Sequence, residues 1–438
     1  MTNKMNTINA LKSINYRLYV SLLLTGLVPT LYTTLRVFFI GEMPGEYSYS
    51  IAGQLAWVNL IFEVVQEAII LPLFFFIGEV AAERKARTNR TKTGLVMSAG
   101  IYTVFAAIVI IFARPMLGFM AASTDIIDAS VTYLRLESVA IIFSTICSFL
   151  MVVLVTIGKE KYLYTFTAVK LVVTCAMDTV LVSSLPFSLK LGVNGIAISN
   201  IIINLVLDVA LLLFLRKEDI DVFSRDAMDF GWAKLFTRQG IISGSESFVR
   251  NFAYSIMICR MVNVVGEQGT YWMANNFIWG WMLLPILQLG ELIKRDCGTD
   301  RVNAMGRIKG YFALTGIICA LWVILIPTYK PFIGSVLNYG ETDTLFHLIM
   351  VLFIPYVFFA FQNIFDSVFY GHGKSEYMLA ESIITNTVYY GAAFILYKNG
   401  IFVPTLTGIA VMFGLGNIFD AFVSWGAYVV FKKRQGYR

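Results

Sequence analysis

The distribution of lysine and arginine constrains the fold of this chain more than any other feature of its sequence. The chain contains about a dozen stretches of roughly 20 apolar residues, the length of helix that crosses a hydrocarbon core about 30 Å thick. Of its 34 Lys and Arg residues, 25 lie in alternate gaps between these stretches. The other gaps contain only Arg114, Lys190, Lys330 and Lys398. Because basic residues mark cytoplasmic loops, the pattern predicts an all-α membrane protein with both termini in the cytoplasm.

The predicted fold has twelve transmembrane helices. We place the spans at 18–41, 51–77, 94–113, 128–156, 163–184, 194–215, 240–262, 271–293, 310–328, 344–370, 377–397 and 405–431. The first begins after Arg17 and lacks a clear small-residue cleavage site, so we expect it to be retained. We expect the chain to lie in the cell (plasma) membrane as a multi-pass protein.

Composition excludes several classes of protein. The hydrophobic content of 58%, the charged content of 14% and the mean hydropathy of +0.72 lie outside the range of soluble domains. The net charge of +6 is explained by the cytoplasmic loops, so we expect no nucleic-acid partner. Phosphate-binding and zinc-protease motifs are missing, and two histidines and five scattered cysteines predict no metal site. We therefore expect no enzyme and no cofactor.

An internal repeat predicts two lobes. Gly195-Ile196-Ala197 and Gly408-Ile409-Ala410 are separated by 213 residues, as are Pro72 and Pro285. Six spans in each copy give a pseudo-two-fold axis along the membrane normal, as in transporters built from parallel repeats. The predicted parts are an N-lobe at 1–215, a cytoplasmic linker at 216–239, a C-lobe at 240–431 and a cytoplasmic tail at 432–438.

Several landmarks resemble the multidrug and toxic compound extrusion (MATE) family, within the multidrug/oligosaccharidyl-lipid/polysaccharide flippase superfamily. They are the first span with Pro29, the paired turns 156–161 and 371–374, and the sixth-span start at 191–197. The resemblance implies a monomeric secondary-active exporter, with membrane lipids around it, that moves a small organic compound by alternating access. The coupling ion would be H⁺ or Na⁺. The alternatives are a flippase for a lipid-linked or anionic lipid, and a transporter of the major facilitator type.

The sequence departs from the resemblance at the expected coupling sites. Where coupled family members often carry an Asp in span one, this chain has Arg36. The Asn-x-x-x-Asp of span five appears as Thr174 and Asp178. The acid of span seven aligns with Arg250, and Glu246 is the alternative. We list Asp178, Thr174 and Glu246 as candidate ion-coupling residues. If Arg36 lies beside Asp178, proton coupling is expected to move to Glu63, Glu67, Glu246 or Asp366.

Polar residues inside the spans supply the candidate substrate contacts. Ionisable residues in membrane helices normally face protein or water. Span two places four polar residues on one helical face, and span ten adds two more. Arg36 and Arg250 are 214 residues apart, close to the repeat offset, and predict a site for carboxylates or phosphates. Glu381, Asp208 and Asp420 are assigned structural roles. The predicted substrate-binding residues are Arg36, Arg250, Asn59, Glu63, Gln66, Glu67, Asn276, Gln362 and Asp366.

Overall fold

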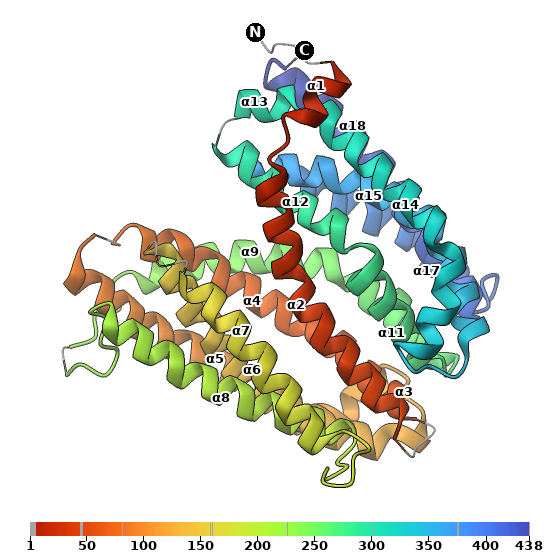
Figure 1. The fold of residues 1–438 in the computed structure, drawn as a ribbon, viewed down its shortest axis with the longest axis horizontal. Helices are drawn as coiled ribbons and strands as arrows, with labels where there is room; N and C mark the ends of the chain where they lie inside the picture. The colour runs from red at the N-terminus through yellow and green to blue at the C-terminus, as the bar shows by residue number, and fades with distance from the viewer. Residues whose placement is uncertain are drawn as a thin grey trace. The chain divides into compact units, whose positions relative to one another are not determined.

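The computed structural model shows an all-helical chain (Figure 1). It describes residues 6–43, 47–80, 82–157, 159, 161–225, 227–299, 301–374 and 376–437. Each of the predicted spans falls on helix in this described part. Eight helices are long and apolar enough to cross a membrane, and nine segments qualify if one bent pair counts as a single span. The all-helical membrane fold is therefore confirmed, whereas the number of twelve spans stays a prediction.

The described chain divides into two compact units. Unit 1 comprises residues 1–34 and 256–438, and unit 2 comprises residues 35–255. Helix α2 (Tyr16–Gly41) is divided between them, with Thr34 in unit 1 and Leu35 in unit 2. The contact-based units thus differ from the predicted lobes in the first and seventh spans. Which segments move together during transport stays a prediction.

Unit 2 is a bundle in which long apolar helices surround a small number of polar side chains. Ile111 and Val209 are 66% and 58% exposed, as expected for helix faces that lipid covers. Ser123 caps the helix Thr124–Thr156 by accepting a hydrogen bond from the Asp125 backbone N–H. Besides the end of α2, the unit contains α3 (Ser48–Gly53), α4 (Leu55–Gly78), α5 (Arg84–Phe119), α6 (Thr124–Thr156), α7 (Lys161–Leu181), α8 (Val193–Lys217) and α9 (Ala233–Tyr254).

Helices α4 and α9 approach each other closely because α9 presents glycines at the contact. A Cβ atom at Gly240 would collide with the carbonyl oxygen of Ala68, and one at Gly244 would lie 2.8 Å from the Ala68 Cβ. Small residues allow membrane helices to pack with their backbones close together. The glycines of α9 therefore determine how it packs on α4.

We expect Gly240→Ala to destabilise the protein by about 1–3 kcal/mol, because the added methyl group overpacks a contact with backbone. Gly100→Ala is the matched control, since Gly100 lies within α5 and a Cβ there would meet nothing within 4 Å. Thermal unfolding in detergent measures both variants. Equal melting temperatures for the two variants would contradict this account of the α4–α9 contact.

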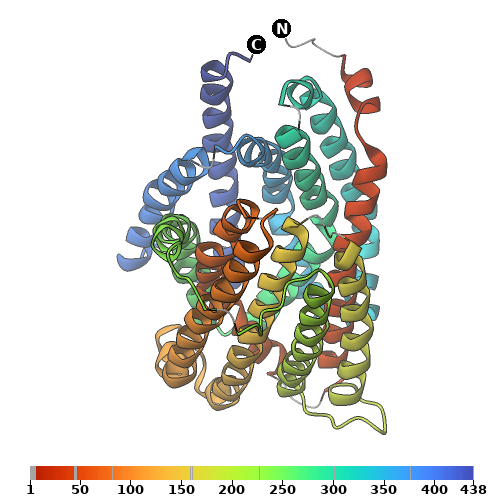
Figure 2. The ribbon, with the colours of Figure 1, turned by 90° about the vertical axis from the view of Figure 1, so that its left-hand side faces the viewer.

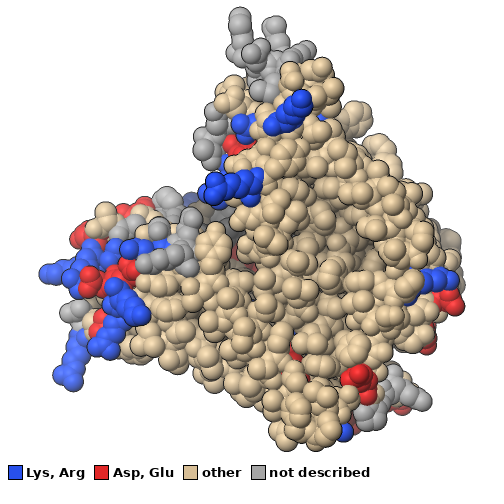
Figure 3. Space-filling model, viewed as in Figure 1, with Lys and Arg blue, Asp and Glu red and all other residues tan. Residues whose placement is uncertain are grey.

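The segment predicted as a linker, 216–239, forms ion pairs and hydrogen bonds with other residues of unit 2. Arg84 pairs with Asp219 at 3.0 Å, and Lys159 pairs with Glu218 at 2.7 Å. Asn89 exchanges two hydrogen bonds with the backbone of Asp229. Figure 3 shows charged side chains gathered over the ends of α4 and α5 and the segment after α8, beside helix flanks almost without charge. This end of unit 2 therefore has the charge expected of a cytoplasmic surface.

Unit 1 contains the longest helices of the second half of the chain. Helices α15 and α18 pack along each other, with α12 and α14 against α15. Helix α1 and the C-terminal end of α18 lie at the same end of this unit (Figures 1 and 2). Its helices include α1 (Thr7–Lys12), α10 (Arg260–Val264), α11 (Gln268–Phe277), α12 (Leu284–Thr299), α13 (Arg301–Gly306), α14 (Ile308–Ser335), α15 (Thr342–Gly371), α16 (Glu376–Ile384), α17 (Gly391–Lys398) and α18 (Leu406–Arg434).

Three π-helical segments lie between consecutive α-helices in the second half of the chain. They are η1 (Ser255–Cys259), η2 (Ile278–Met282) and η3 (Thr385–Tyr390). At η2 the predicted eighth span bends by 54°. The hydroxyl of Thr30 donates to the carbonyl oxygen of Gly280 at 3.0 Å, and that of Tyr19 donates to the carbonyl oxygen of Pro285 at 2.9 Å. Side chains of α2 therefore form hydrogen bonds with carbonyl groups at the break and just after it.

Candidate functional site

A buried ion pair joins α2 and α7 inside unit 2. The Nε of Arg36 donates to Oδ2 of Asp178 at 2.6 Å, and Nη2 donates to Oδ1 at 3.4 Å. The side chain of Asp178 is 0% exposed and that of Arg36 is 13% exposed. A guanidinium that engages both oxygens of one carboxylate forms a strong, oriented pair. The structure thus places Arg36 beside Asp178, the arrangement that the family resemblance implies.

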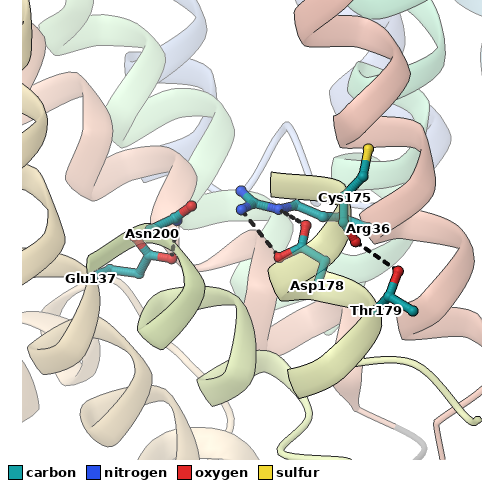
Figure 4. A network of polar contacts seen from close by, with 6 residues as sticks. All are labelled: Arg36, Glu137, Cys175, Asp178, Thr179 and Asn200. Atoms are coloured by element: carbon teal, nitrogen blue, oxygen red, sulfur yellow. Dashed lines mark hydrogen bonds and ion pairs between the residues drawn. The ribbon is translucent and has the colours of Figure 1, made fainter. Parts of the chain in front are cut away.

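A second carboxylate lies next to this pair. Glu137 of α6 is buried and accepts two hydrogen bonds from the Asn200 amide of α8, at 2.9 and 3.1 Å. Figure 4 shows the guanidinium of Arg36 extending between Asp178 and the Glu137–Asn200 pair. Arg36, Asp178 and Glu137 together contribute one positive and two negative formal charges. The site combines a fixed ion pair with a separate hydrogen-bonded acid.

The other candidate coupling residue of α7 is also enclosed. Thr174 lies one turn before Asp178, and its side chain is 1% exposed. Its hydroxyl oxygen has no hydrogen-bond partner among the described residues. A buried hydroxyl group without a hydrogen-bond partner lowers the folding stability, so Thr174 is an unfavourable residue for packing alone. Its role in ion coupling stays a prediction.

Unit 1 contains a different polar centre, built around Gln362 of α15. The Gln362 amide nitrogen donates to Oε1 of Glu381 and to Oδ2 of Asp420, both at 2.7 Å. Thr385 of η3 donates to Asp420 at 2.5 Å. Asp366, one turn after Gln362, accepts a hydrogen bond from Ser424 of α18 at 2.8 Å. We call Asp366, Glu381 and Asp420 the acid cluster.

The acid cluster includes two residues that the sequence analysis left outside the predicted substrate-binding set. Glu381 and Asp420 were predicted to have only structural roles because each stands alone in its own span. The structure brings both to Gln362, which belongs to the predicted substrate-binding set. Asp208, assigned the same structural role, accepts a hydrogen bond from the Cys147 thiol at 2.9 Å. No described group of three or more acidic, histidine or cysteine residues has an arrangement that could hold a metal ion.

The remaining predicted residues do not join either centre in the described contacts. Asn59 and Gln66 are exposed on α4, where Glu63 and Glu67 are partly buried. Asn276 donates to the backbone oxygen of Trp272 within its own helix. Glu246 and Arg250 lie on α9, but their side chains are outside the described part of the structure. The predicted pairing of Arg36 and Arg250 around one anion therefore stays a prediction.

Sequence reasoning missed Glu137 and Asn200. Both lie within apolar spans, and an ionisable residue such as Glu137 inside a span is a sufficient signal for a functional candidate. Asn200, Asn204 and Asp208 also follow each other at intervals of four along α8. This spacing indicates a polar helix face of the same kind that was recognised in span two.

The comparisons with known proteins agree on the fold. A family model described as MatE matches residues 79–185. No curated protein shows significant sequence similarity to this chain. An inward-facing multidrug resistance MATE transporter of the MOP superfamily aligns with a TM-score of 0.74 at 16% identity, over 92% of this chain and 95% of that one. The chain has the fold of MATE transporters.

Two further solved structures align with this chain over almost its whole length. A mutant of the Vibrio cholerae MATE transporter VcmN gives a TM-score of 0.70 at 14% identity, with 98% of each chain covered. A MOP superfamily transporter from Pyrococcus furiosus gives 0.61 at 18% identity, over 98% of this chain and 99% of that one. That transporter is described as having a binding pocket of reversed polarity, which suggests a different function for it. The predicted resemblance to the MATE family is confirmed.

Proposed function

We propose that this chain is a secondary-active transporter that moves a small organic compound across the cell membrane by alternating access. The observation that carries the proposal is the MATE fold over nearly the whole chain, with relatives solved in inward-facing and outward-facing forms. The structural similarity favours a MATE-like transporter over the alternative of a major-facilitator transporter. Intramembrane charges in both units support transport, because such residues are costly in lipid and normally serve a pathway.

The structure also supports a change in the coupling site. Arg36 occupies the position at which an acidic residue was expected from the family resemblance, and it holds Asp178 in an ion pair. A carboxylate that already accepts two hydrogen bonds from a guanidinium leaves little room for a sodium ion. We therefore propose that Arg36 and Asp178 stabilise unit 2 and do not carry the coupling ion.

The anionic character of the substrate is part of the same proposal. An anion can bind the Arg36 guanidinium only by competing with Asp178, and Glu137 adds a second negative charge nearby. The positive site predicted from Arg36 and Arg250 therefore requires that the substrate rearranges the ion pair. If the substrate rearranges the ion pair in this way, Arg36→Gln will reduce uptake of an organic anion by at least tenfold and leave uptake of an organic cation unchanged.

Reconstitution tests transport against lipid flipping. Proteoliposomes are given a proton or a sodium gradient, and uptake of ethidium and of carboxyfluorescein is recorded beside the flipping of a fluorescent phosphatidylserine. We expect gradient-dependent movement of one of the two dyes without lipid flipping. Lipid flipping without dye transport would instead support the flippase alternative. If neither dye nor lipid moves under either gradient, the transporter assignment is wrong.

A further inference from the structure

The acid cluster of unit 1 has more negative groups than its surroundings neutralise. Three carboxylates from α15, α16 and α18 share hydrogen bonds with Gln362, Thr385 and Ser424. Among the described residues, no lysine or arginine forms an ion pair with Asp366, Glu381 or Asp420. Like charges close together in a poorly hydrated site cannot all ionise without a large cost.

The basic residues on neighbouring helices have other contacts. Lys294 of α12, which packs against α15, pairs with Glu291 at 2.7 Å and lies 5.2 Å from the Tyr370 ring centroid. Arg260 lies on α10, which contacts α18, and it forms no ion pair with the acid cluster. The Tyr389 hydroxyl of η3 donates to the backbone oxygen of Met412. Lys294 therefore offsets part of the charge of Asp366, whereas no described basic residue on these elements forms an ion pair with Glu381 or Asp420.

The hydrogen-bond pattern distinguishes the three acids from one another. Asp420 accepts from Gln362 on one oxygen and from Thr385 on the other, which suits an ionised carboxylate. Glu381 accepts on Oε1 only, and its Oε2 is buried without a partner. The side-chain oxygen of Gln362 is also buried without a partner, and both residues are only 4% exposed. The acid cluster therefore contains two buried acceptor atoms, Oε2 of Glu381 and the side-chain oxygen of Gln362, that receive no hydrogen bond from the described residues.

A proton supplies the missing donor. When Oε2 of Glu381 is protonated, it changes from an acceptor to a donor, and the number of negative charges in the cluster falls. The amide of Gln362 can then keep its hydrogen bonds to Oε1 of Glu381 and to Asp420. A neutral Glu381 beside an ionised Asp420 satisfies more of this buried hydrogen-bond network than three carboxylates do.

We propose that the acid cluster is a proton-binding site, in which Glu381 carries the exchangeable proton and Gln362 connects it to Asp420. In the transport cycle this proton is the coupling ion, a role that rests on the proposed function. Asp178 cannot fill that role while it is paired with Arg36. The proposal therefore assigns to α15, α16 and α18 the coupling function that the family resemblance predicts for the first and fifth spans.

Infrared difference spectroscopy on the purified full chain in detergent tests the site without any transport. We expect wild-type protein at neutral pH to show the carbonyl stretch of a buried carboxylic acid, shifted in D₂O. Glu381→Gln should remove this band, whereas Glu376→Gln should keep it, since Glu376 is 59% exposed and pairs with Lys374. Because other buried acids can contribute, the component lost on substitution is the measured quantity.

Three results would overturn the proposal. They are the absence of a buried acid band from the wild type, an unchanged band in Glu381→Gln, and loss of the band when Na⁺ replaces K⁺ at constant pH. If Glu381→Gln does not fold, Asp420→Asn is used instead. This variant removes the neighbouring charge and should shift the Glu381 band, and an unchanged spectrum would contradict the proposal. The band should be present even if the chain transports nothing, so failure of the site and failure of the proposed function are distinguishable.

Discussion

The Asp178→Asn variant is expected to lose about 3–5 kcal/mol of folding stability. The substitution preserves the shape of the side chain but leaves the Arg36 guanidinium in the interior of unit 2 without its counter-charge. Arg36→Gln combined with Asp178→Asn should recover most of the loss, because the double variant removes both members of the ion pair and leaves no arginine without its partner. Thermal and chemical unfolding in detergent measure the three variants.

The exposed pair of Arg114 and Asp128 supplies the matched control. Its side chains are 61% and 78% exposed, so Asp128→Asn should change stability very little. If Asp178→Asn is no more destabilising than Asp128→Asn, the ion pair does not stabilise unit 2. If the double variant is as unstable as Asp178→Asn alone, the loss comes from Asp178 itself and not from an unpaired arginine.

The helices were predictable from the sequence because lipid imposes two simple conditions on a chain. A span needs about 20 apolar residues, and the loops on the cytoplasmic side attract lysine and arginine. Both conditions are local and can be read without tertiary structure. The segment 216–239 shows the limit of such reasoning. Its charges were recognised, but their partners on α5 and in the turn before α7 lie far away in the sequence.

The candidate sites were predictable only in part. The contact between Arg36 and Asp178 followed from the family resemblance, and the structure contains it. Glu137 and Asn200 meet only because α6 packs on α8, which no periodicity within one helix can show. Glu381 and Asp420 each look isolated for the same reason. A polar residue acquires its role in a membrane helix bundle from residues on other helices, so single-span patterns underestimate these clusters.

The division of α2 between the two units has a physical basis in its side chains. Its first two thirds carry Tyr19 and Thr30, which donate to carbonyl oxygens at the broken span of unit 1. Its last turns carry Arg36, which pairs within unit 2. Helix α2 therefore forms its polar contacts with different residues at its two ends. The sequence indicates the residues involved, whereas only the packing shows which unit each end joins.

Proton-driven transport in proteoliposomes tests the central claim most directly, because it compares the two candidate coupling centres in one assay. The substrate is the dye that the wild-type chain moves, and an imposed pH gradient is the only driving force. The variants are Arg36→Gln with Asp178→Asn, and Glu381→Gln. The measured quantity is the ratio of uptake with the gradient to uptake without it, which separates coupling from substrate binding. We expect the double variant to keep this ratio within about threefold of wild type, and Glu381→Gln to reduce it at least tenfold. Gradient-driven transport that survives in Glu381→Gln and disappears in the double variant would contradict the account.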